Sequence, residues 1–227
     1  MDQHLIDYLS QFLTEERFLL FKSVISNRTR YLTVVLEDIF QTQNASAVLR
    51  SCECFGIQDV HIIENKNKFQ VNTDVVRGST NWLDLHIHNK NENNNTLCAI
   101  EHLRSEGYRI VATTPHDGDV DLENFNLHKG KTAIFFGTER RGISNIVKEN
   151  ADEFLKIPMH GFTESLNISV SVAVIIHYLT LKMRELDLDW RLSTEEYNAL
   201  LVRWMANNVK GGDLIVKKYF EANNRSI

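Results

Sequence analysis

Short apolar runs alternate with helical segments through the middle of this 227-residue chain, and this alternation limits the folds that it can adopt. Residues 32–37 have the pattern of a buried strand, residues 45–55 that of a helix that Gly56 ends, and residues 59–64 that of a second strand. The asparagine-rich residues 89–95 predict an exposed loop. Further strands are predicted at 108–113, 132–136 and 154–157. Strands that alternate with helices usually build a largely parallel sheet, so the sequence predicts an α/β domain.

Helices are expected on both sides of this core. Residues 3–25 carry apolar side chains at helical spacing, and residues 193–223 have the pattern of two helices, the first with a capping box from Ser193 to Glu196. The run that follows Ser165 is rich in β-branched residues, but its length favours a buried helix. We therefore expect an N-terminal helical extension, a core domain and a C-terminal helical extension at residues 1–30, 31–185 and 186–227.

The composition places the chain among ordinary globular proteins, with 43% hydrophobic and 24% charged residues. No apolar run reaches the roughly 18 residues that span a bilayer, and the N-terminus lacks the basic segment of a secretory signal. The cysteines, Cys52, Cys54 and Cys98, lack CxxC spacing and form no plausible disulfide framework. We expect a cytoplasmic protein without membrane contacts or a bound metal.

The net charge of −5 bears on possible partners, because nucleic-acid binders usually carry an overall positive charge or a basic stripe. Any contact with RNA must therefore come from local patches. An ordinary solvated surface is the simpler interpretation of each basic pair, but five pairs are candidates: Arg28 with Arg30, Lys66 with Lys68, Arg140 with Arg141, Lys182 with Arg184, and Lys217 with Lys218.

Familiar ligand-binding motifs are absent from the sequence. No GxGxxG follows the first strand and no GxxxxGK(S/T) occurs, so a nucleotide-like ligand would have to be held without those glycine scaffolds. HExxH is also missing, and His86 and His88 alone are more typical of a structural pair than of metal ligands.

Three short segments carry polar residues that a ligand could use. The first, residues 44–51, places Asn44 and Arg50 after the first strand, at the edge where α/β sheets bind ligands. Arg50 could bind a phosphate or a ribose hydroxyl through the N–H donors of its planar guanidinium group. Asn44 is also typical of a helix N-cap, and Arg50 would then be an ordinary surface residue.

The second segment, residues 134–144, runs from a buried strand into a turn that holds Glu139 between Gly137 and Gly142. Glycines at such a turn let the backbone approach a ligand closely. A simple polar turn has the same pattern, so this segment alone does not decide between the two interpretations.

The third segment runs from Ile157 to Val170, where a loop after a strand leads into an apolar helix that opens with Ser165 and Asn167. Polar side chains that enter such a helix need partners, because leaving one unpaired in a core costs about 1 to 3 kcal/mol. Hydrogen bonds inside the core or a bound ligand would satisfy them.

Together and in this order, NASAVLRS, IFFGTERRGIS and IPMHGFTESLNISVSVAV resemble the three motifs of the SpoU (TrmH) family of RNA 2′-O-ribose methyltransferases, in the SPOUT superfamily. The resemblance extends through residues 78–82 and 111–113 and covers nearly the whole chain. It implies a parallel α/β fold with a deep trefoil knot in its C-terminal segment and with flanking N- and C-terminal helices. It also implies a homodimer whose subunits pack across the knot.

The resemblance implies a cofactor, a substrate and a set of site residues. S-adenosylmethionine is expected to bind the knot loops at the matching positions, which are Thr113, Gly137, Ile157, Met159, Ser165 and Leu166. Its methyl group is expected to pass to a ribose 2′-hydroxyl in RNA, with guanosine 18 of the tRNA D-loop as the substrate. The matching catalytic positions are Asn44, Arg50, Glu139, Ser165 and Asn167. Arg50 is expected to be essential, but a guanidinium group gives up its proton only at a high cost, so a phosphate or a water could be the proton acceptor.

Three alternatives stay open, and one of them is a cofactor-free interaction protein, in which the polar residues of the motifs would serve as helix caps and core hydrogen bonds. A ribosomal RNA 2′-O-methyltransferase would share the reaction, although such relatives often carry a separate N-terminal RNA-binding domain that residues 1–30 are too few to supply. A noncatalytic RNA-binding module would share the fold, but it would have no need for all the polar residues of the three motifs.

Overall fold

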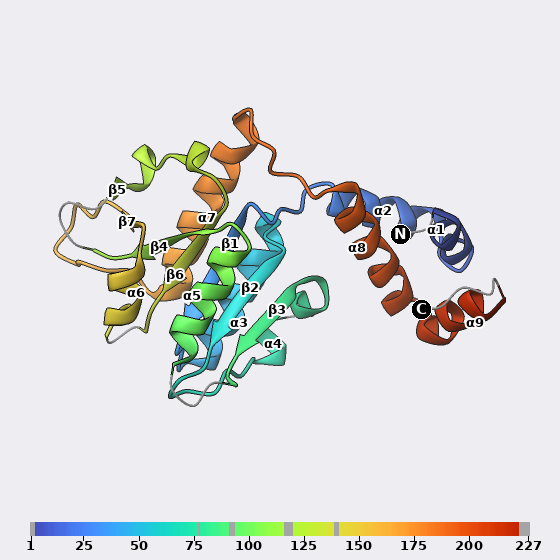
Figure 1. Ribbon diagram of the computed structural model, residues 1–227, viewed down its shortest axis with the longest axis horizontal. Helices are drawn as coiled ribbons and strands as arrows, with labels where there is room; N and C mark the ends of the chain where they lie inside the picture. Colours follow the sequence, from blue (N-terminus) through green and yellow to red (C-terminus); the bar gives the residue numbers. More distant parts are fainter. Residues whose placement is uncertain (1–2, 77, 91–93, 116–119, 139–140, 223–227) are drawn as a thin grey trace. The chain divides into compact units, whose positions relative to one another are not determined.

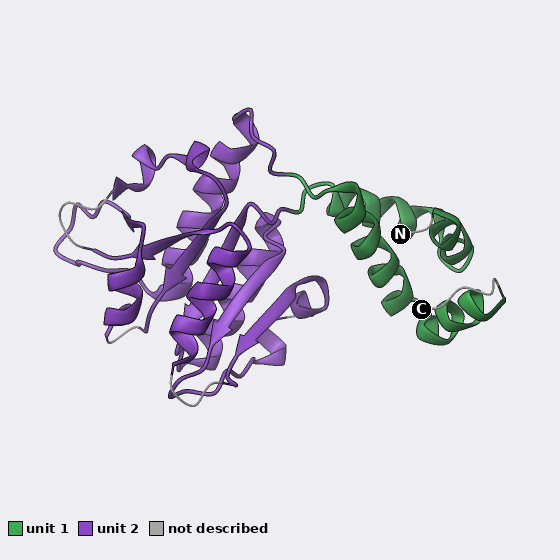
Figure 2. Ribbon diagram, viewed as in Figure 1, with its two compact units in different colours: residues 1–28, 191–227 green, residues 29–190 purple. Residues whose placement is uncertain are grey.

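Two compact units make up the computed structural model, which describes residues 3–76, 78–90, 94–115, 120–138 and 141–222 (Figure 2). One unit combines the two ends of the chain, residues 1–28 and 191–227, and the other is the continuous segment 29–190. The N- and C-terminal helices therefore pack with each other in a single unit.

The unit of residues 29–190 is built on a seven-stranded sheet in which the described strands pair in parallel (Figure 1). The strands are, in spatial order, β3 (Asp84–His88), β2 (Asp59–Ile63), β1 (Leu32–Glu37), β6 (Thr132–Phe136), β4 (Arg109–Thr113), β7 (Glu153–Lys156) and β5 (Val120–Asp121). The predicted α/β fold with a parallel sheet is confirmed. The two-residue strand β5 is too short to leave a pattern in the sequence.

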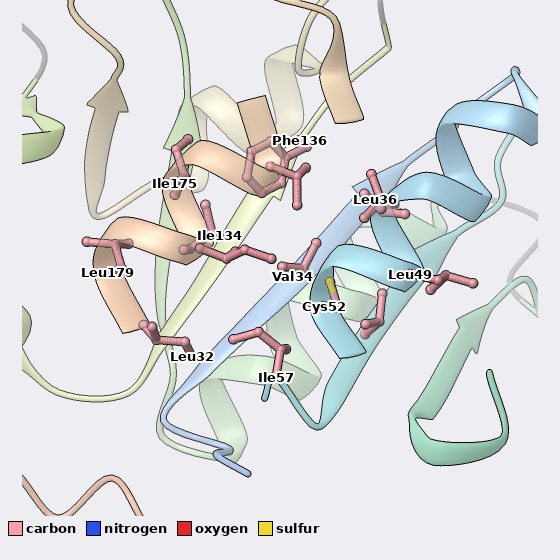
Figure 3. Packing of buried hydrophobic residues seen from close by; sticks show 14 of the residues in the cluster. Leu32, Val34, Leu36, Leu49, Cys52, Ile57, Ile134, Phe136, Ile175 and Leu179 are labelled. Carbon is pink, nitrogen blue, oxygen red and sulfur yellow. The ribbon is translucent and has the colours of Figure 1, made fainter. Parts of the chain in front are cut away.

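Alternating side chains on the strands build two separate cores, one on each face of the sheet. The covering helices are α3 (Thr42–Phe55) and α7 (Ile168–Glu185) on one face, and α5 (Asn95–Ser105) and α6 (Asn145–Asn150) on the other. Leu32, Val34 and Leu36 of β1 pack on the α3 and α7 side, as Figure 3 shows. Val35 belongs to the opposite core, so β1 is buried on both faces. The predicted helix after Ser165 is confirmed as α7, although only one of its faces is buried in this chain.

Helix α3 begins three residues before the predicted position 45, and this changes the role of Asn44. Gln41 occupies the N-cap position and makes no side-chain capping bond, so the interpretation of Asn44 as an N-cap is wrong. At the other end the prediction is confirmed, because Gly56 adopts a left-handed φ of 83° that favours glycine.

The asparagine-rich stretch does more than form an exposed loop. Asn94 caps α5 by accepting the backbone N–H of Leu97, and Asn95 is buried and donates its side-chain amide to the carbonyl of Glu64. The prediction is therefore wrong for Asn95, which is buried and begins α5, whereas Asn94 stays outside the helix as its N-cap. Residues 91–93 lie outside the described part of the chain.

The other unit contains α1 (Gln3–Ser10), α2 (Glu15–Ile25), α8 (Thr194–Asn208) and α9 (Gly212–Ala222), and α8 packs against the other three. The predicted capping box at its start is confirmed, because Ser193 and Glu196 each accept the backbone N–H of the other. Arg28 is buried with its guanidinium 5.3 Å from the ring centroid of Trp204, so it stabilises this unit and is not an RNA contact. None of the described helices is long and apolar enough to cross a bilayer.

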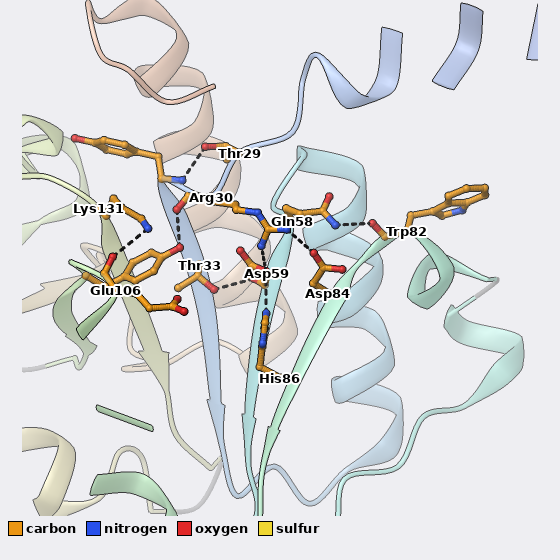
Figure 4. Close-up of polar contacts among 12 residues, drawn as sticks. Thr29, Arg30, Thr33, Gln58, Asp59, Trp82, Asp84, His86, Glu106 and Lys131 are labelled. Carbon is orange, nitrogen blue, oxygen red and sulfur yellow. Dashed lines mark hydrogen bonds and ion pairs between the residues drawn. The ribbon is translucent and has the colours of Figure 1, made fainter. Parts of the chain in front are cut away.

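An ion-pair network ties together the amino ends of β1, β2 and β3 (Figure 4). The guanidinium of Arg30 pairs with Asp59 and, at 2.6 Å, with Asp84. The imidazole of His86 lies 2.9 Å from the same Asp59 carboxylate, and this hydrogen bond raises the pKa of His86. Arg30 is thus committed to the fold, and the candidate pair Arg28 with Arg30 is wrong as an RNA-binding patch.

A cluster of histidines lies between β2, β3 and α5. The buried ring of His61 stacks on His86 and His88, with ring centroids 4.5 and 5.3 Å away, and its Nδ1 lies 3.0 Å from Nε2 of His88. His102 of α5 completes the cluster. Burial and the neighbouring imidazoles lower the pKa of His61 to about 2 and that of His88 to about 4. The structural interpretation of His86 and His88 agrees with this packing.

Acid should destabilise the fold through this cluster. His61 and His88 stay neutral in the folded chain but bind protons near pH 6.5 when unfolded, so their stabilisation is complete above pH 6.5 and is lost as the pH falls toward their folded pKa values. His86 acts in the opposite sense, because its raised pKa stabilises the fold below pH 6.5. We expect the free energy of unfolding to fall between pH 7 and pH 5, with about 2 kcal/mol from His61.

Urea unfolding at the two pH values measures this effect. The variant His61→Phe keeps a stacked ring but cannot titrate, so it should show a weaker pH dependence, whereas His128→Gln, which changes an exposed histidine, should behave as the wild type. Equal pH dependence in the wild type and His61→Phe would contradict the assignment.

Candidate active site

The carboxyl ends of β4, β6 and β7 open into a cavity of about 350 Å³. Parallel strands place the loops that follow them along one edge of the sheet, where α/β proteins bind their ligands. The described lining comes from residues 113–115 at the end of β4 and from residues 136–138 and 141–143 at the end of β6 and after it. From the end of β7 onward it comes from residues 155, 157, 159, 164–166 and 168. Helix α7 closes the cavity with Ser171 and Ile175.

The residues matched to cofactor binding all line this one cavity. They are Thr113, Gly137, Ile157, Met159, Ser165 and Leu166. Thr113 stands at the end of β4, where its hydroxyl donates to the carbonyl of Phe135 at 2.8 Å. The fold therefore brings together residues from three segments that the sequence separates.

The cavity combines apolar walls with a polar rim. Phe136, Leu155 and Ile175 are buried side chains of the core, whereas Arg141 and Lys148 are exposed at the edge. Such a site suits a ligand with a flat apolar part and charged or polar groups. The motifs did not point to Lys148, because it lies on α6 outside all three segments and only the fold places it here.

The turn after β6 closes on itself, which gives Gly137 a structural role in addition to the predicted contact with a ligand. A Cβ atom at Gly137 would lie 2.1 Å from the carbonyl carbon and oxygen of Gly142. Thr138 and Gly142 exchange two backbone hydrogen bonds, and Gly142 has a φ of 65°. Glycine at 137 is therefore required by the chain itself, so the prediction that it admits a ligand is not needed to explain it. Glu139 lies outside the described residues.

A buried carboxylate that the motifs did not point to holds this turn in place. Glu37, at the end of β1, accepts hydrogen bonds from the hydroxyls of Thr96 and Ser144, both at 2.7 Å, and from the Ser144 backbone N–H at 2.9 Å. Ser144 in turn caps α6 by accepting the N–H of Val147. In the sequence, only the position of Glu37, an acidic residue at the end of an apolar strand, could have indicated that it stabilises this turn.

Asn44 and Asn167 join the first segment to the third. The side-chain amide of Asn167 donates to Oδ1 of Asn44 at 3.2 Å, although the two residues lie 123 positions apart. Asn44 also donates to Oε1 of Gln41, and Oδ1 of Asn167 accepts from the N–H and the hydroxyl of Ser169. Asn167 therefore has partners within the chain. The expectation that polar side chains enter a core here is wrong, because Ser165 and Asn167 are both exposed.

Arg50 lies apart from this group. It is exposed on α3, six residues after Asn44, which corresponds to about 9 Å along the helix axis. Arg50 is not part of the described cavity lining, and it makes no hydrogen bond or ion pair with the described residues. A single copy of the chain brings Asn44 and Asn167 together but does not bring Arg50 to the cavity.

The remaining basic pairs separate into structural and exposed ones. Lys182 donates to the carbonyls of Glu123 and Phe125, and Arg184 donates to those of Thr180 and Phe55, so this pair serves the fold. Arg140 lies outside the described residues. The exposed candidates are Lys66, Lys68, Arg141, Lys217 and Lys218.

A parallel α/β sheet with a mixed polar and apolar cavity at its carboxyl edge defines the class of ligand-binding α/β proteins. Residues 31–177 match the SpoU rRNA Methylase family, and the chain belongs to this family. The resemblance seen in the three motifs is thereby confirmed.

Curated relatives and a solved structure are similar over most of the chain. The tRNA (guanosine(18)-2′-O)-methyltransferase of Borreliella burgdorferi is 44% identical over 210 residues, which are 92% of this chain and 94% of the relative. The protein of the same name from Thermus thermophilus is 30% identical and covers 85% of this chain and 97% of its own. The TrmH/SpoU tRNA modifying enzyme of A. aeolicus is 26% identical, with a TM-score of 0.73, over 86% of this chain and 98% of that chain.

Replacing Gly137 by alanine should disturb the turn that borders the cavity. The added Cβ would overlap the backbone of Gly142, and such overpacking typically costs about 1 to 3 kcal/mol. We expect Gly137→Ala to lower the free energy of unfolding by that amount. Gly161→Ala is the matched control, because the nearest described atom would lie 4.0 Å from its Cβ. Equal stability of the two variants in urea unfolding would refute the packing argument.

Proposed function

We propose that this chain is a cytoplasmic RNA 2′-O-ribose methyltransferase that uses S-adenosylmethionine and modifies guanosine 18 in the D-loop of tRNA. The observation that carries the proposal is the convergence of the matched cofactor residues on one cavity at the carboxyl edge of the sheet. The name of the Borreliella burgdorferi relative supports the choice of nucleotide.

The cavity fits the cofactor in size and chemistry. Its volume of about 350 Å³ lies within the usual range for small-molecule sites. Ile157, Leu166 and Ile175 offer apolar surface to an adenine ring, and Thr113 and Ser165 offer hydroxyls nearby. When bound, S-adenosylmethionine supplies a methyl group that its sulfonium charge makes electrophilic.

The residues of the chain would orient the ribose and stabilise the charge that develops on it. A 2′-hydroxyl is a weak nucleophile until its proton leaves. Arg50 would remain a cation and stabilise the emerging alkoxide, because a guanidinium pKa above about 12 makes its deprotonation costly. The proton would pass to an RNA phosphate or to a water. Asn44, Glu139 and Asn167, with Ser165 at the cavity, would position Arg50 and the ribose.

A homodimer would resolve the separation of Arg50 from the cavity. Val170, Val174 and Leu181 are 45%, 38% and 51% exposed on the outer face of α7, although the opposite face of this helix is buried in the core. A helix that is apolar on all sides normally has neighbours on all sides. Helix α3, which carries Arg50, packs beside α7 on the same face of the sheet. We propose that a second copy covers α7 and that Arg50 of each copy serves the cavity of its partner.

The order of the strands supports the trefoil knot as part of the same proposal. β7 lies between β4 and β5, both of which precede it in the chain. A late strand inserted between two earlier, connected strands is the arrangement that threading of the C-terminal segment would produce. Knots are rare enough that ordinary topology would not predict one.

Methyl transfer to defined tRNA tests the proposed function. The purified protein is incubated with labelled cofactor and two tRNA species that differ only in carrying guanosine or 2′-deoxyguanosine at position 18. We expect label in 2′-O-methylguanosine from the first species alone. A base-methylated product, or equal labelling of both species, would refute the proposal, and preferential labelling of ribosomal RNA would support the alternative substrate.

Arg50→Ala should abolish transfer while leaving cofactor binding nearly intact. We expect transfer to fall by at least about 100-fold, as for removal of one transition-state-stabilising group, and the affinity for S-adenosylhomocysteine to change by less than about 2-fold. Single-turnover transfer and equilibrium titration measure the two quantities. Surviving activity would exclude Arg50 from catalysis.

Mixing two inactive variants tests whether Arg50 acts across the dimer. Leu166→Trp should fill the cavity and block the cofactor while leaving Arg50 in place. Mixed dimers of Arg50→Ala and Leu166→Trp would then contain one complete site, so activity should reappear after subunit exchange. Absence of any recovery, with mixed dimers shown to form, would mean that Arg50 acts within its own chain.

A further inference from the structure

A second hollow lies at the same edge of the sheet, between the start of α3 and the loop that follows β2. It has a volume of about 580 Å³, and we call it the α3 groove. Its lining residues are Phe40, Gln41, Thr42, Gln43, Lys66, Asn67, Lys68 and Gln70. This lining contains an aromatic ring, two ammonium groups and several side-chain amides, whereas the cofactor cavity has largely aliphatic walls.

Phe40 is the unusual member of this lining. It is 75% exposed, although burial of a phenylalanine side chain would contribute about 1.5 to 3 kcal/mol. It stands in the short connection from β1 to α3, so it projects from the edge of the sheet that carries the proposed active site. An exposed ring at the edge of a polar groove is suited to stack on a nucleobase.

The loop opposite Phe40 presents Lys66 and Lys68 on a fixed backbone. Asp38 accepts the backbone N–H groups of Asn65 and Lys66, both at 2.8 Å, so its carboxylate is already used to shape this loop. Neither lysine ammonium forms an ion pair with a carboxylate among the residues that the structure describes. These are also among the few candidate RNA contacts that remain exposed, in a chain with a net charge of −5.

The groove connects directly to the residues of the proposed active site. Gln41 lines the groove and accepts a 2.9 Å hydrogen bond from the side chain of Asn44, which in turn accepts from Asn167. A ligand in the groove that contacts Gln41 would therefore be connected to Asn44 through the side chain of this one residue. The exposed amides of Gln43 and Gln70 each offer a donor and an acceptor, which is what the edge of a base requires.

We infer that the α3 groove binds a nucleotide that flanks the methylated ribose. Phe40 stacks on its base, the glutamine amides bind the edge of the base, and Lys66 and Lys68 contact the adjoining phosphates. This assignment rests on the proposed function, because it identifies where the RNA substrate of that reaction is held. A second copy of the chain could also cover the exposed Phe40, and the test distinguishes this contact from binding of a nucleotide.

Two substitutions at position 40 test the stacking. Phe40→Leu keeps an apolar side chain without a ring, and it should weaken equilibrium binding of unmodified tRNA by about 10-fold, in the range known for loss of one stacked base. Phe40→Trp should bind tRNA within about 2-fold of the wild type, because indole also stacks. The affinity for S-adenosylhomocysteine should stay unchanged in both variants.

A charge-matched pair of double variants tests the phosphate contacts. In Lys66→Ala/Lys68→Ala the slope of log Kd for tRNA against log salt concentration should fall by about 1.4 to 1.8. Lys129→Ala/Lys131→Ala removes the same charge just before β6, at the amino edge of the sheet, and should leave the slope unchanged.

The outcomes distinguish a failure of the groove assignment from a failure of the proposed function. If the wild type methylates tRNA but Phe40→Leu binds it as tightly as the wild type does, the groove assignment is overturned and the proposed function stands. A change in sedimentation of Phe40→Leu would instead assign Phe40 to contact between copies. If the wild type transfers methyl groups to no RNA, the function and the groove assignment fail together.

Discussion

Parallel pairing of the strands is the constraint on which the rest of this structure depends. Because all strands run in one direction, their carboxyl ends share one edge, and the loops that follow β4, β6 and β7 meet around one cavity. The hydrogen bond from Asn167 to Asn44 joins the loop after β7 to the start of α3 at that edge. The opposite edge carries the ion pairs of Arg30 with Asp59 and Asp84, which stabilise the fold. The ion pairs of Arg30 and the cavity are thus separated by the length of the strands, whereas Glu37 stabilises the edge that carries the cavity.

Buried contacts determine the shape of the cavity before any ligand binds. Glu37 accepts two hydrogen bonds from Ser144 and so fixes the start of α6. The close approach of Gly137 to Gly142 closes the turn that joins β6 to α6. Glu37 and Ser144 can therefore influence ligand binding through the shape of the cavity, without contacting the ligand themselves. A site fixed in this way loses less conformational entropy when it binds a ligand than a flexible loop would.

Much of the fold could be predicted from local patterns, and the rest depends on contacts between distant residues. The short apolar runs of the strands, the capping box at Ser193 and the end of α3 at Gly56 depend on a few neighbouring residues, so the sequence displays them directly. The strand order and the pairing of Lys182 with carbonyls 57 and 59 positions away depend on the folded chain. The resemblance in the three motifs led to the cavity residues, but Arg50 lies six residues after Asn44 on α3 and is not part of the described cavity lining. Only the folded chain shows which residues surround the cavity.

The central claim is that the cavity between β4, β6 and the start of α7 is a cofactor site. Titration calorimetry with S-adenosylhomocysteine, followed by a crystal structure of the complex, tests it most directly. The account predicts one saturable site per chain, with the ligand in contact with Thr113, Gly137 and Leu166. Absence of binding by the folded protein, or a ligand located outside this cavity, would contradict it.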